Sequence, residues 1–339
     1  MKKAIIGLGI AAVIGMSMVS IGAVAQQKFT LRWAHYLPKG EFLEVEEAFA
    51  KRVEQRTDGA VKFRIAYSGA LGGGNEVLQL VGRGAVDMAA IVPGYYPDQL
   101  RYWKASQIPM VFDSPGIAVE VMQTSVKEFP EFNQELDKLG VKFLFQQALG
   151  SYYLTGPGEN CHTLAGIANK KVRAFGSDIP KVLTAAEATP LTIPVIEIYE
   201  ALQRGALDYS FLNLGNVVSN RVHEAGKYTC GPIMTMGGHL TVIGKRTWDR
   251  LPENYRQIIL EEAAVAQQEY PEWLDKSDAK MVETIKASGA SVRAFDEADL
   301  KKWKAQTPDL LENWVQDMKK FNQEESAARI AKRWRELTQ

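Results

Sequence analysis

The chain has few of the side chains that most often carry catalysis or bind metals. Only four histidines and two cysteines occur among its 339 residues. The histidines are His35, His162, His223 and His239, and their spacing matches neither H-E-x-x-H nor any other paired-ligand motif. No G-x-S-x-G nucleophile elbow is present, and neither cysteine has the context of a catalytic thiol. We therefore expect a binding protein without cofactor or metal rather than an enzyme.

The chain also lacks an excess of charge of either sign. Its 40 Lys and Arg residues balance 40 Asp and Glu residues, which gives a formal net charge of zero at pH 7. This balance argues against nucleic acid or an anionic membrane surface as the main partner. A second long apolar run is missing after residue 25, so we expect a soluble protein, and we expect it to be monomeric.

The first 25 residues have the features of a secretory signal peptide. Lys2 and Lys3 supply positive charge, residues 4–21 are uncharged, and Ala23-Val24-Ala25 is the small-x-small pattern that a signal peptidase accepts. The alternative is a membrane anchor, which needs about 20 apolar residues. Glycines and serines dilute this run and a cleavage pattern follows directly. We therefore expect cleavage and a periplasmic protein, without a lipid anchor because no cysteine lies near the cleavage point.

The remaining 314 residues are too many for one ordinary core and suit two lobes. Strand and helix patterns alternate, which is typical of α/β layers. The predicted strands are residues 29–33, 61–67, 86–92, 141–147, 171–175 and 207–212. The predicted helices are residues 42–55, 75–83, 129–139, 180–188 and 194–204, with long charged helices after residue 252.

The two cysteines, Cys161 and Cys230, leave two alternatives open. In an oxidising compartment a single pair forms a disulfide, whereas the other interpretation is two buried free thiols. Both residues fall in the second predicted lobe. A disulfide there would crosslink that lobe without blocking a hinge between the lobes.

Three segments of the chain carry motifs that are informative about its family only in combination. They are residues 49–88, with FAKRVE at 49–54, TDG at 57–59 and GAVDM at 84–88; NKKVR at 169–173; and PVIEIYEALQRGALD at 194–208. In this order and spacing they resemble the substrate-binding proteins of tripartite ATP-independent periplasmic (TRAP) transporters, the family that includes C4-dicarboxylate-binding proteins.

The resemblance implies an α/β fold with two lobes, a venus-flytrap ligand cleft between them, and C-terminal helices. Lobe I would comprise residues 26–150 and about 238–278. Lobe II would comprise residues 151–237 and about 279–339.

The same resemblance assigns Arg173 to the ligand carboxylate, because the family places an arginine here at a strand end facing the cleft. A planar guanidinium suits this role, since it offers parallel donors to both carboxylate oxygens and stays charged. An asparagine that assists this arginine in relatives falls either at Asn213 or at the position of Leu212. The sequence leaves that alignment open.

The chain departs from the family where relatives with polar ligands carry polar side chains. Aromatic or aliphatic residues stand there instead: Tyr95, Tyr96, Tyr152, Tyr153, Phe211 and Leu212. His35 and Val195 complete the predicted contacts, and we expect about half of the four tyrosines to be core residues. Burying unpaired hydroxyl groups costs about 1–3 kcal/mol each, so a sugar acid fits this composition poorly.

These observations predict a periplasmic receptor for an organic anion. We expect a monocarboxylate with an aromatic or apolar body, such as a 2-oxo or 2-hydroxy acid. The resemblance implies TRAP-type permease subunits as partners. The alternatives are a receptor that passes the signal to a membrane kinase and a periplasmic enzyme.

Overall fold

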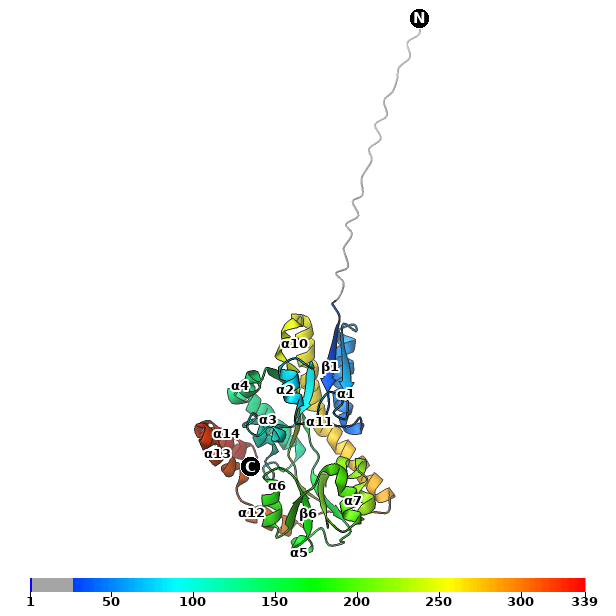
Figure 1. Ribbon diagram of the computed structural model, residues 1–339, viewed down its shortest axis with the longest axis vertical. Helices are drawn as coiled ribbons and strands as arrows, with labels where there is room; N and C mark the ends of the chain where they lie inside the picture. The colour runs from blue at the N-terminus through cyan, green and yellow to red at the C-terminus, as the bar shows by residue number, and fades with distance from the viewer. Residues whose placement is uncertain (2–26, 339) are drawn as a thin grey trace.

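The computed structural model describes Met1 and residues 27–338. The predicted cleavage site and nearly all of the predicted signal peptide therefore lie outside the described residues. Two α/β lobes are stacked along the long axis, and the helix α11 (Glu253–Ala287) runs from one to the other (Figure 1). None of the helices in the described part of the chain combines the length and apolar character needed to cross a bilayer.

The first lobe is built on a five-stranded sheet in the order β2-β1-β3-β10-β4. Its strands are β1 (Phe29–Ala34), β2 (Val61–Ala66), β3 (Met88–Ile91), β4 (Val141–Ala148) and β10 (Gly237–Gly244). β1 pairs in parallel with β2 and β3, whereas β10 is antiparallel to both of its neighbours. Parallel strands that end at one edge bring the residues after β1 and β3 together there.

Helices cover both faces of this sheet because successive side chains of each strand point to opposite faces. One face, which carries Trp33 and Phe145, packs against α1 (Glu44–Arg56) and the first half of α11. The other packs against α2 (Val77–Gly82), α3 (Pro115–Glu128) and α4 (Pro130–Lys138). Short elements η1 (Glu41–Leu43), η2 (Pro93–Tyr95), η3 (Trp103–Gln107) and α10 (Lys245–Arg250) complete the lobe.

The second lobe has a four-stranded sheet in the order β11-β9-β5-β8 and a parallel pair, β6-β7. The strands are β5 (Tyr152–Gly156), β6 (Lys171–Ala174), β7 (Thr189–Thr192), β8 (Ser210–Asn213), β9 (Tyr228–Met234) and β11 (Ser291–Arg293). The helical elements are α5 (Leu164–Ile167), α6 (Ile179–Ala185), η4 (Val195–Glu197), α7 (Ile198–Gln203), α8 (Leu214–Ser219), α9 (Val222–Ala225) and α12 (Glu297–Gln306). A disulfide joins Cys161 to Cys230 within this lobe. The two cysteines are therefore bonded and are not the pair of buried free thiols that the sequence also allowed.

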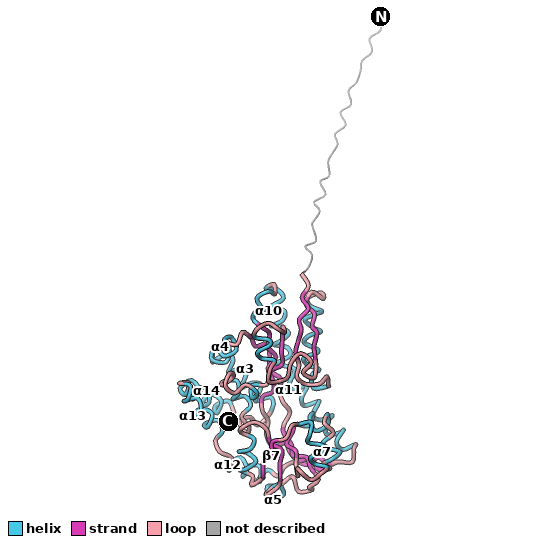
Figure 2. The backbone as a smooth tube through the Cα atoms, viewed as in Figure 1, coloured by secondary structure: helices cyan, strands magenta, loops and turns pink. Residues whose placement is uncertain are grey.

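The chain crosses between the lobes at several places. The segment 149–151 links β4 to β5, the segment 235–236 links β9 to β10, and α11 packs its first half on one lobe and its last turns on the other. Loops and α11 make the connection in Figure 2. These crossings are where lobe closure would bend the chain.

The last helices lie in a different lobe from the one predicted. We assigned all of about 279–339 to lobe II, but α13 (Leu310–Met318), η5 (Lys319–Phe321) and α14 (Glu324–Leu337) pack on the first lobe, beside α3 (Figure 1). The Nε1 of Trp314 donates to the carbonyl of Arg101, and the Nε1 of Trp334 donates to the hydroxyl of Ser125. Composition predicted long charged helices here, but it does not say which lobe receives their apolar face.

Candidate functional site

Arg173 is a buried cation without an anionic partner among the described residues. It lies on β6 and is 8% exposed, and its Nε donates to the carbonyl of Ile193 at 3.1 Å. The guanidinium carbon lies 4.5 Å from the ring centre of Phe175. Burial lowers the pKa of Arg173, although Tyr152 and Tyr95 oppose this effect. Within residues 27–338 no carboxylate pairs with it and its two terminal nitrogens have no hydrogen-bond partner, so both remain available to an anion.

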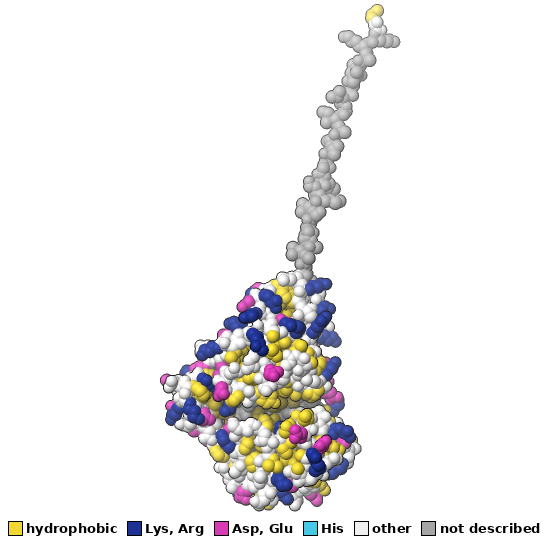
Figure 3. All heavy atoms as spheres, viewed as in Figure 1, with side chains coloured by type: hydrophobic (Ala, Val, Ile, Leu, Met, Phe, Trp, Pro, Cys, Tyr) yellow, Lys and Arg dark blue, Asp and Glu magenta, His cyan; other side chains and the backbone are white. Residues whose placement is uncertain are grey.

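Tyr95 and Tyr152, one from each lobe, interact electrostatically with this arginine, and Tyr36 lies beside Tyr95. Tyr36 follows β1 and Tyr95 ends η2 in the first lobe, whereas Tyr152 begins β5 in the second. The rings of Tyr36 and Tyr95 meet edge-on at 6.3 Å. Burial raises the pKa of Tyr152 to about 12, against the opposing effect of Arg173. The groove between the lobes has hydrophobic side chains on both rims (Figure 3).

Successive side chains along β5 and β8 point to opposite faces of the sheet, so only every second residue of each strand faces this cleft. Tyr152 pairs with Asn213 across the antiparallel ladder, and Tyr153 pairs with Leu212, so the two pairs point to opposite faces. Tyr153 and Leu212 lie in a hydrophobic cluster with Ile198 and are nearly inaccessible. The structure thus places both residues in the core, on the face opposite Tyr152 and Asn213.

Phe211 and Phe175 support the ring of Tyr152. Phe211 is fully buried, with its ring centre 5.4 Å from that of Tyr152, so it lies behind the cleft wall rather than on it. Phe175 stacks on Tyr152 at 6.1 Å and also contacts Arg173. Phe175 was not predicted as a contact, although its position directly after β6 is a signal that would have found it. Tyr36, like His35, directly follows the first strand, and that position indicated the cleft.

Asn213 lies on the cleft-side face, and only one of the two polar atoms of its side-chain amide has a hydrogen-bond partner. Its Oδ1 accepts from the backbone N–H of Asn216 and so caps α8, which leaves its Nδ2 without a partner in the described chain. Of the two alignments left open by the sequence, the geometry favours Asn213 over Leu212 for the asparagine position. Asn213 lines a cavity of about 70 Å³ where the lobes meet, together with Tyr36, Gly150 and Asp278.

Two further predicted contacts, Tyr96 and Val195, pack against other parts of the protein. The hydroxyl of Tyr96 donates to the carbonyl of Gly74 and accepts from the N–H of Leu78, and the ring is 4% exposed. Tyr96 is therefore a core residue that fixes the preceding glycine-rich turn. Val195 is half-buried against the cluster that contains Ile198.

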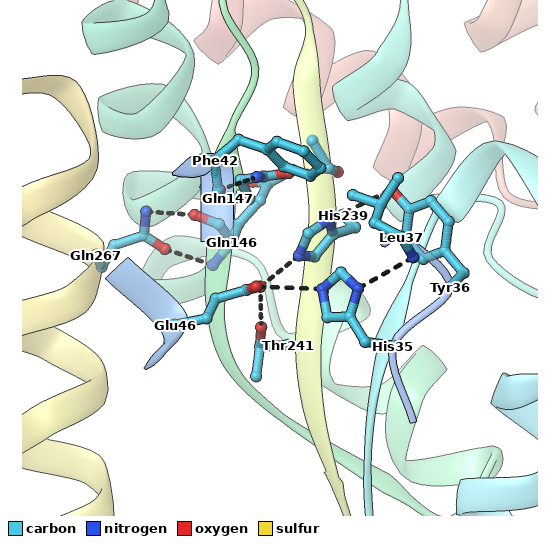
Figure 4. Close-up of polar contacts among 11 residues, drawn as sticks. His35, Tyr36, Leu37, Phe42, Glu46, Gln146, Gln147, His239, Thr241 and Gln267 are labelled. Carbon is cyan, nitrogen blue, oxygen red and sulfur yellow. Dashed lines mark hydrogen bonds and ion pairs between the residues drawn. The ribbon is translucent and has the colours of Figure 1, made fainter. Parts of the chain in front are cut away.

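His35, another predicted contact, is 1% exposed and bonded to Glu46. His35 Nε2 lies 3.1 Å from Glu46 Oε2, and His239 Nε2 lies 2.5 Å from Glu46 Oε1 (Figure 4). Burial alone would raise the pKa of Glu46, but the two histidines bring it down to about 2. The scattered histidines of the sequence thus meet in one cluster, which their spacing did not reveal.

The ligand atoms of His35, Glu46 and His239 lie within 4.8 Å of one another, a spacing compatible with a metal ion. The hydrogen bonds argue against that use. The N–H of Leu37 donates to His35 Nδ1, so a neutral His35 carries its proton on Nε2, the nitrogen that faces Glu46. A protonated nitrogen cannot ligate a metal. The cluster is therefore a buried hydrogen-bond network as it stands.

Asp278 on α11 gives the junction cavity a titratable group. Burial raises its pKa from 3.8 to about 7, and Asp275 adds to the effect. A carboxyl with a raised folded-state pKa contributes stability that is present below pH 3.8 and is lost as the pH rises through 7. Asp278→Asn should therefore raise the free energy of unfolding by about 1–2 kcal/mol at pH 8, after discounting the shift for partial exposure.

The same substitution should give no gain at pH 4, where Asp278 is largely protonated in the folded protein. Urea unfolding of both proteins at the two pH values measures this difference. Glu283→Gln is the matched control, because Glu283 is exposed on the same helix. An equal gain at both pH values would contradict the assigned pKa.

Comparison with known proteins places the chain in a family. The model of "bacterial extracellular solute-binding protein, family 7" (DctP) matches residues 34–317. A solute-binding protein of Chromohalobacter salexigens is 24% identical over 317 residues, which cover 91% of each chain.

Solved structures share the fold. A Bordetella pertussis solute receptor that binds pyroglutamic acid is 17% identical and superposes with a TM-score of 0.77 over 90% of this chain and 99% of its own. A TRAP periplasmic solute-binding protein from Desulfovibrio salexigens with bound orotic acid is 20% identical, with a TM-score of 0.77 over 91% and 100% of the two chains. The predicted two-lobed α/β fold is confirmed. The chain belongs to the DctP family of bacterial extracellular solute-binding proteins, whose members are receptors rather than enzymes.

Proposed function

We propose that this protein is a periplasmic receptor for an organic monocarboxylate with an apolar or aromatic body, a 2-oxo or 2-hydroxy acid, which it delivers to a TRAP-type membrane permease. The observation that carries the proposal is the buried, unpaired guanidinium of Arg173. A desolvated cation without a counter-ion is unfavourable, and a bound carboxylate would remove that cost through two parallel hydrogen bonds.

The rest of the cleft supports one carboxylate rather than two. Tyr95 and Tyr152 lie near the arginine, Tyr36 lies beside Tyr95, and Asn213 adds a free amide donor. Tyrosine combines an apolar ring with one hydroxyl, which suits an acid that carries a single polar substituent on an apolar body. Pyroglutamic and orotic acids, the ligands of two relatives, are ring-bearing monocarboxylic acids.

Capture would involve both lobes. Arg173 and Tyr152 belong to the second lobe, and Tyr36 and Tyr95 belong to the first, so a ligand touching all four favours closure. The signal peptide expected at residues 1–25 fits this role, because export would bring the receptor to its ligand on the outer side of the inner membrane.

A ligand panel tests the proposal. Thermal unfolding is followed with phenylpyruvate, phenyllactate, 2-oxoisocaproate and 2-hydroxyisocaproate, with the dicarboxylates succinate and malate, and with glucuronate. We expect one or more of the apolar monocarboxylates to stabilise the protein by about 2.7 kcal/mol at a hundred times its Kd. The primary amide of the same acid should give no shift, since it lacks the charge that pairs with Arg173.

Either of two results would contradict the proposal. Equal shifts with the acid and its amide would show that Arg173 does not anchor the ligand. Shifts with dicarboxylates or glucuronate alone would show that the aromatic cleft does not select an apolar body.

A further inference from the structure

We infer that Tyr36 selects ligands that carry a hydrogen-bond donor beside the carboxylate, so that the receptor prefers a 2-hydroxy acid to the matching 2-oxo acid. The inference rests on the proposed function and narrows its ligand class. It follows from the direction of the hydrogen bonds around Glu46, which can be worked out one proton at a time.

The first proton is that of His35. The backbone N–H of Leu37 lies 3.1 Å from His35 Nδ1, which must therefore accept. The proton of the neutral ring is then on Nε2 and is donated to Glu46 Oε2 at 3.1 Å. A backbone N–H cannot reverse its direction, so this end of the network is fixed.

The second proton is that of His239. Glu46 accepts from His35, and its Oε1 also accepts from the hydroxyl of Thr241 at 3.3 Å. Hydrogen-bond donors at both oxygens favour the ionised carboxylate. His239 Nε2, 2.5 Å from Oε1, must then donate. Burial lowers the pKa of His239, against the opposing effect of Glu46, which favours a neutral ring whose Nδ1 accepts from the Tyr36 hydroxyl beside it.

The third proton is that of the Tyr36 hydroxyl, which lies 3.4 Å from His239 Nδ1. Burial raises the pKa of Tyr36 well above 10, so the hydroxyl stays protonated and donates inward. Its ring cannot turn away easily, because it stacks on His35 at 5.5 Å and meets His239 edge-on at 5.7 Å (Figure 4). Tyr36 therefore presents only oxygen lone pairs to a ligand.

This direction decides between two closely related ligands. The hydroxyl of a 2-hydroxy acid can donate to Tyr36, whereas the carbonyl of a 2-oxo acid brings a second acceptor to the same place. A binding site discriminates strongly against a ligand that leaves one of the site's buried hydrogen-bond acceptors unpaired. The 2-oxo acid would do so at Tyr36. His239 acts through Tyr36 and is a positioning residue, because removing its Nδ1 would free the tyrosine proton to turn outward.

Calorimetric titration with matched acids tests the inference. The probes are 2-hydroxyisocaproate against 2-oxoisocaproate, and phenyllactate against phenylpyruvate. We expect the wild type to bind the hydroxy member of the bound pair about tenfold more tightly. Tyr36→Phe keeps the ring contacts and removes the oxygen, so the ratio of the two Kd values should fall to within twofold. His239→Gln should lower the ratio in the same direction while Tyr36 is still present.

Tyr96→Phe is the matched control, because its hydroxyl is buried against Gly74 and Leu78, outside the cleft. It should leave the ratio unchanged. A Tyr36→Phe protein that binds both acids with the wild-type ratio, or a wild type that prefers the oxo acid, would overturn the inference and leave the proposed function intact. Failure of every monocarboxylate to bind would instead overturn the proposed function, and this inference with it.

Discussion

Arg173→Met should weaken ligand binding by about thirtyfold or more while making the ligand-free protein more stable. Removing one partner of a buried, hydrogen-bonded charge pair costs about 2–5 kcal/mol of binding free energy, between thirtyfold and several thousandfold in Kd. Methionine also fills much of the arginine's volume without its charge. Since Arg173 is 8% exposed and has no anionic partner in the described chain, losing its charge should raise the free energy of unfolding by about 1–2 kcal/mol.

Weaker binding together with higher stability would distinguish a ligand-binding role of Arg173 from a structural role. An arginine that served the fold would destabilise the protein when replaced, whereas one kept for its ligand should do the reverse. Arg173→Lys should bind weakly, because the ammonium retains charge but lacks the planar fork. Arg204→Ala is the control, since Arg204 is exposed and paired with Glu200 four residues earlier. Titration calorimetry and urea unfolding give the two readouts, and an Arg173→Met protein of wild-type affinity would refute the assignment.

Replacing both cysteines with alanine should lower the free energy of unfolding by about 4 kcal/mol. The residues are 69 positions apart, and a crosslink closing a loop of that length restricts the unfolded chain by about this amount. Cys161 precedes α5 and Cys230 lies on β9, so the effect belongs to the second lobe. At temperatures where the variant remains folded, its ligand affinity should equal that of the wild type.

Urea unfolding of the double variant measures this loss. The wild type unfolded in the presence of a thiol reductant is the matched comparison, and its curve should coincide with that of the variant. A loss below about 1 kcal/mol would show that the disulfide contributes little to the fold. Such a large expected effect fits an oxidising compartment, where the bond forms and persists.

Much of the fold could be predicted because its elements have strong local signals. Residues 29–33 and 61–67 were predicted as strands and form β1 and β2, and residues 129–139 were predicted as a helix that contains α4. The prediction missed β9 and β10, whose apolar and small residues follow no alternating pattern because both faces of β10 are buried. Only pairing with distant strands defines these two as strands.

The site could be predicted at Arg173, where the resemblance supplied a motif that composition lacks. The neighbours were harder, because adjacent tyrosines look alike in a sequence. Tyr95 is 51% exposed and Tyr96 is 4% exposed, although one peptide bond separates them. Which of them faces the cleft depends on the η2 turn, and which of Tyr152 and Tyr153 does so depends on the register of β5 with β8. Neither quantity has a local signature.

The return of α14 to the first lobe sets an order of events during biosynthesis. Trp334 packs against Phe112 and Ser125, and β10 fills a central place in the first sheet. Chains are synthesised at about 5–20 residues per second, so on the order of ten seconds or more separate β4 from the helix that completes its lobe. Throughout that interval the lobe synthesised first remains unfinished. The first lobe therefore has its full set of helices only after α14 has been made.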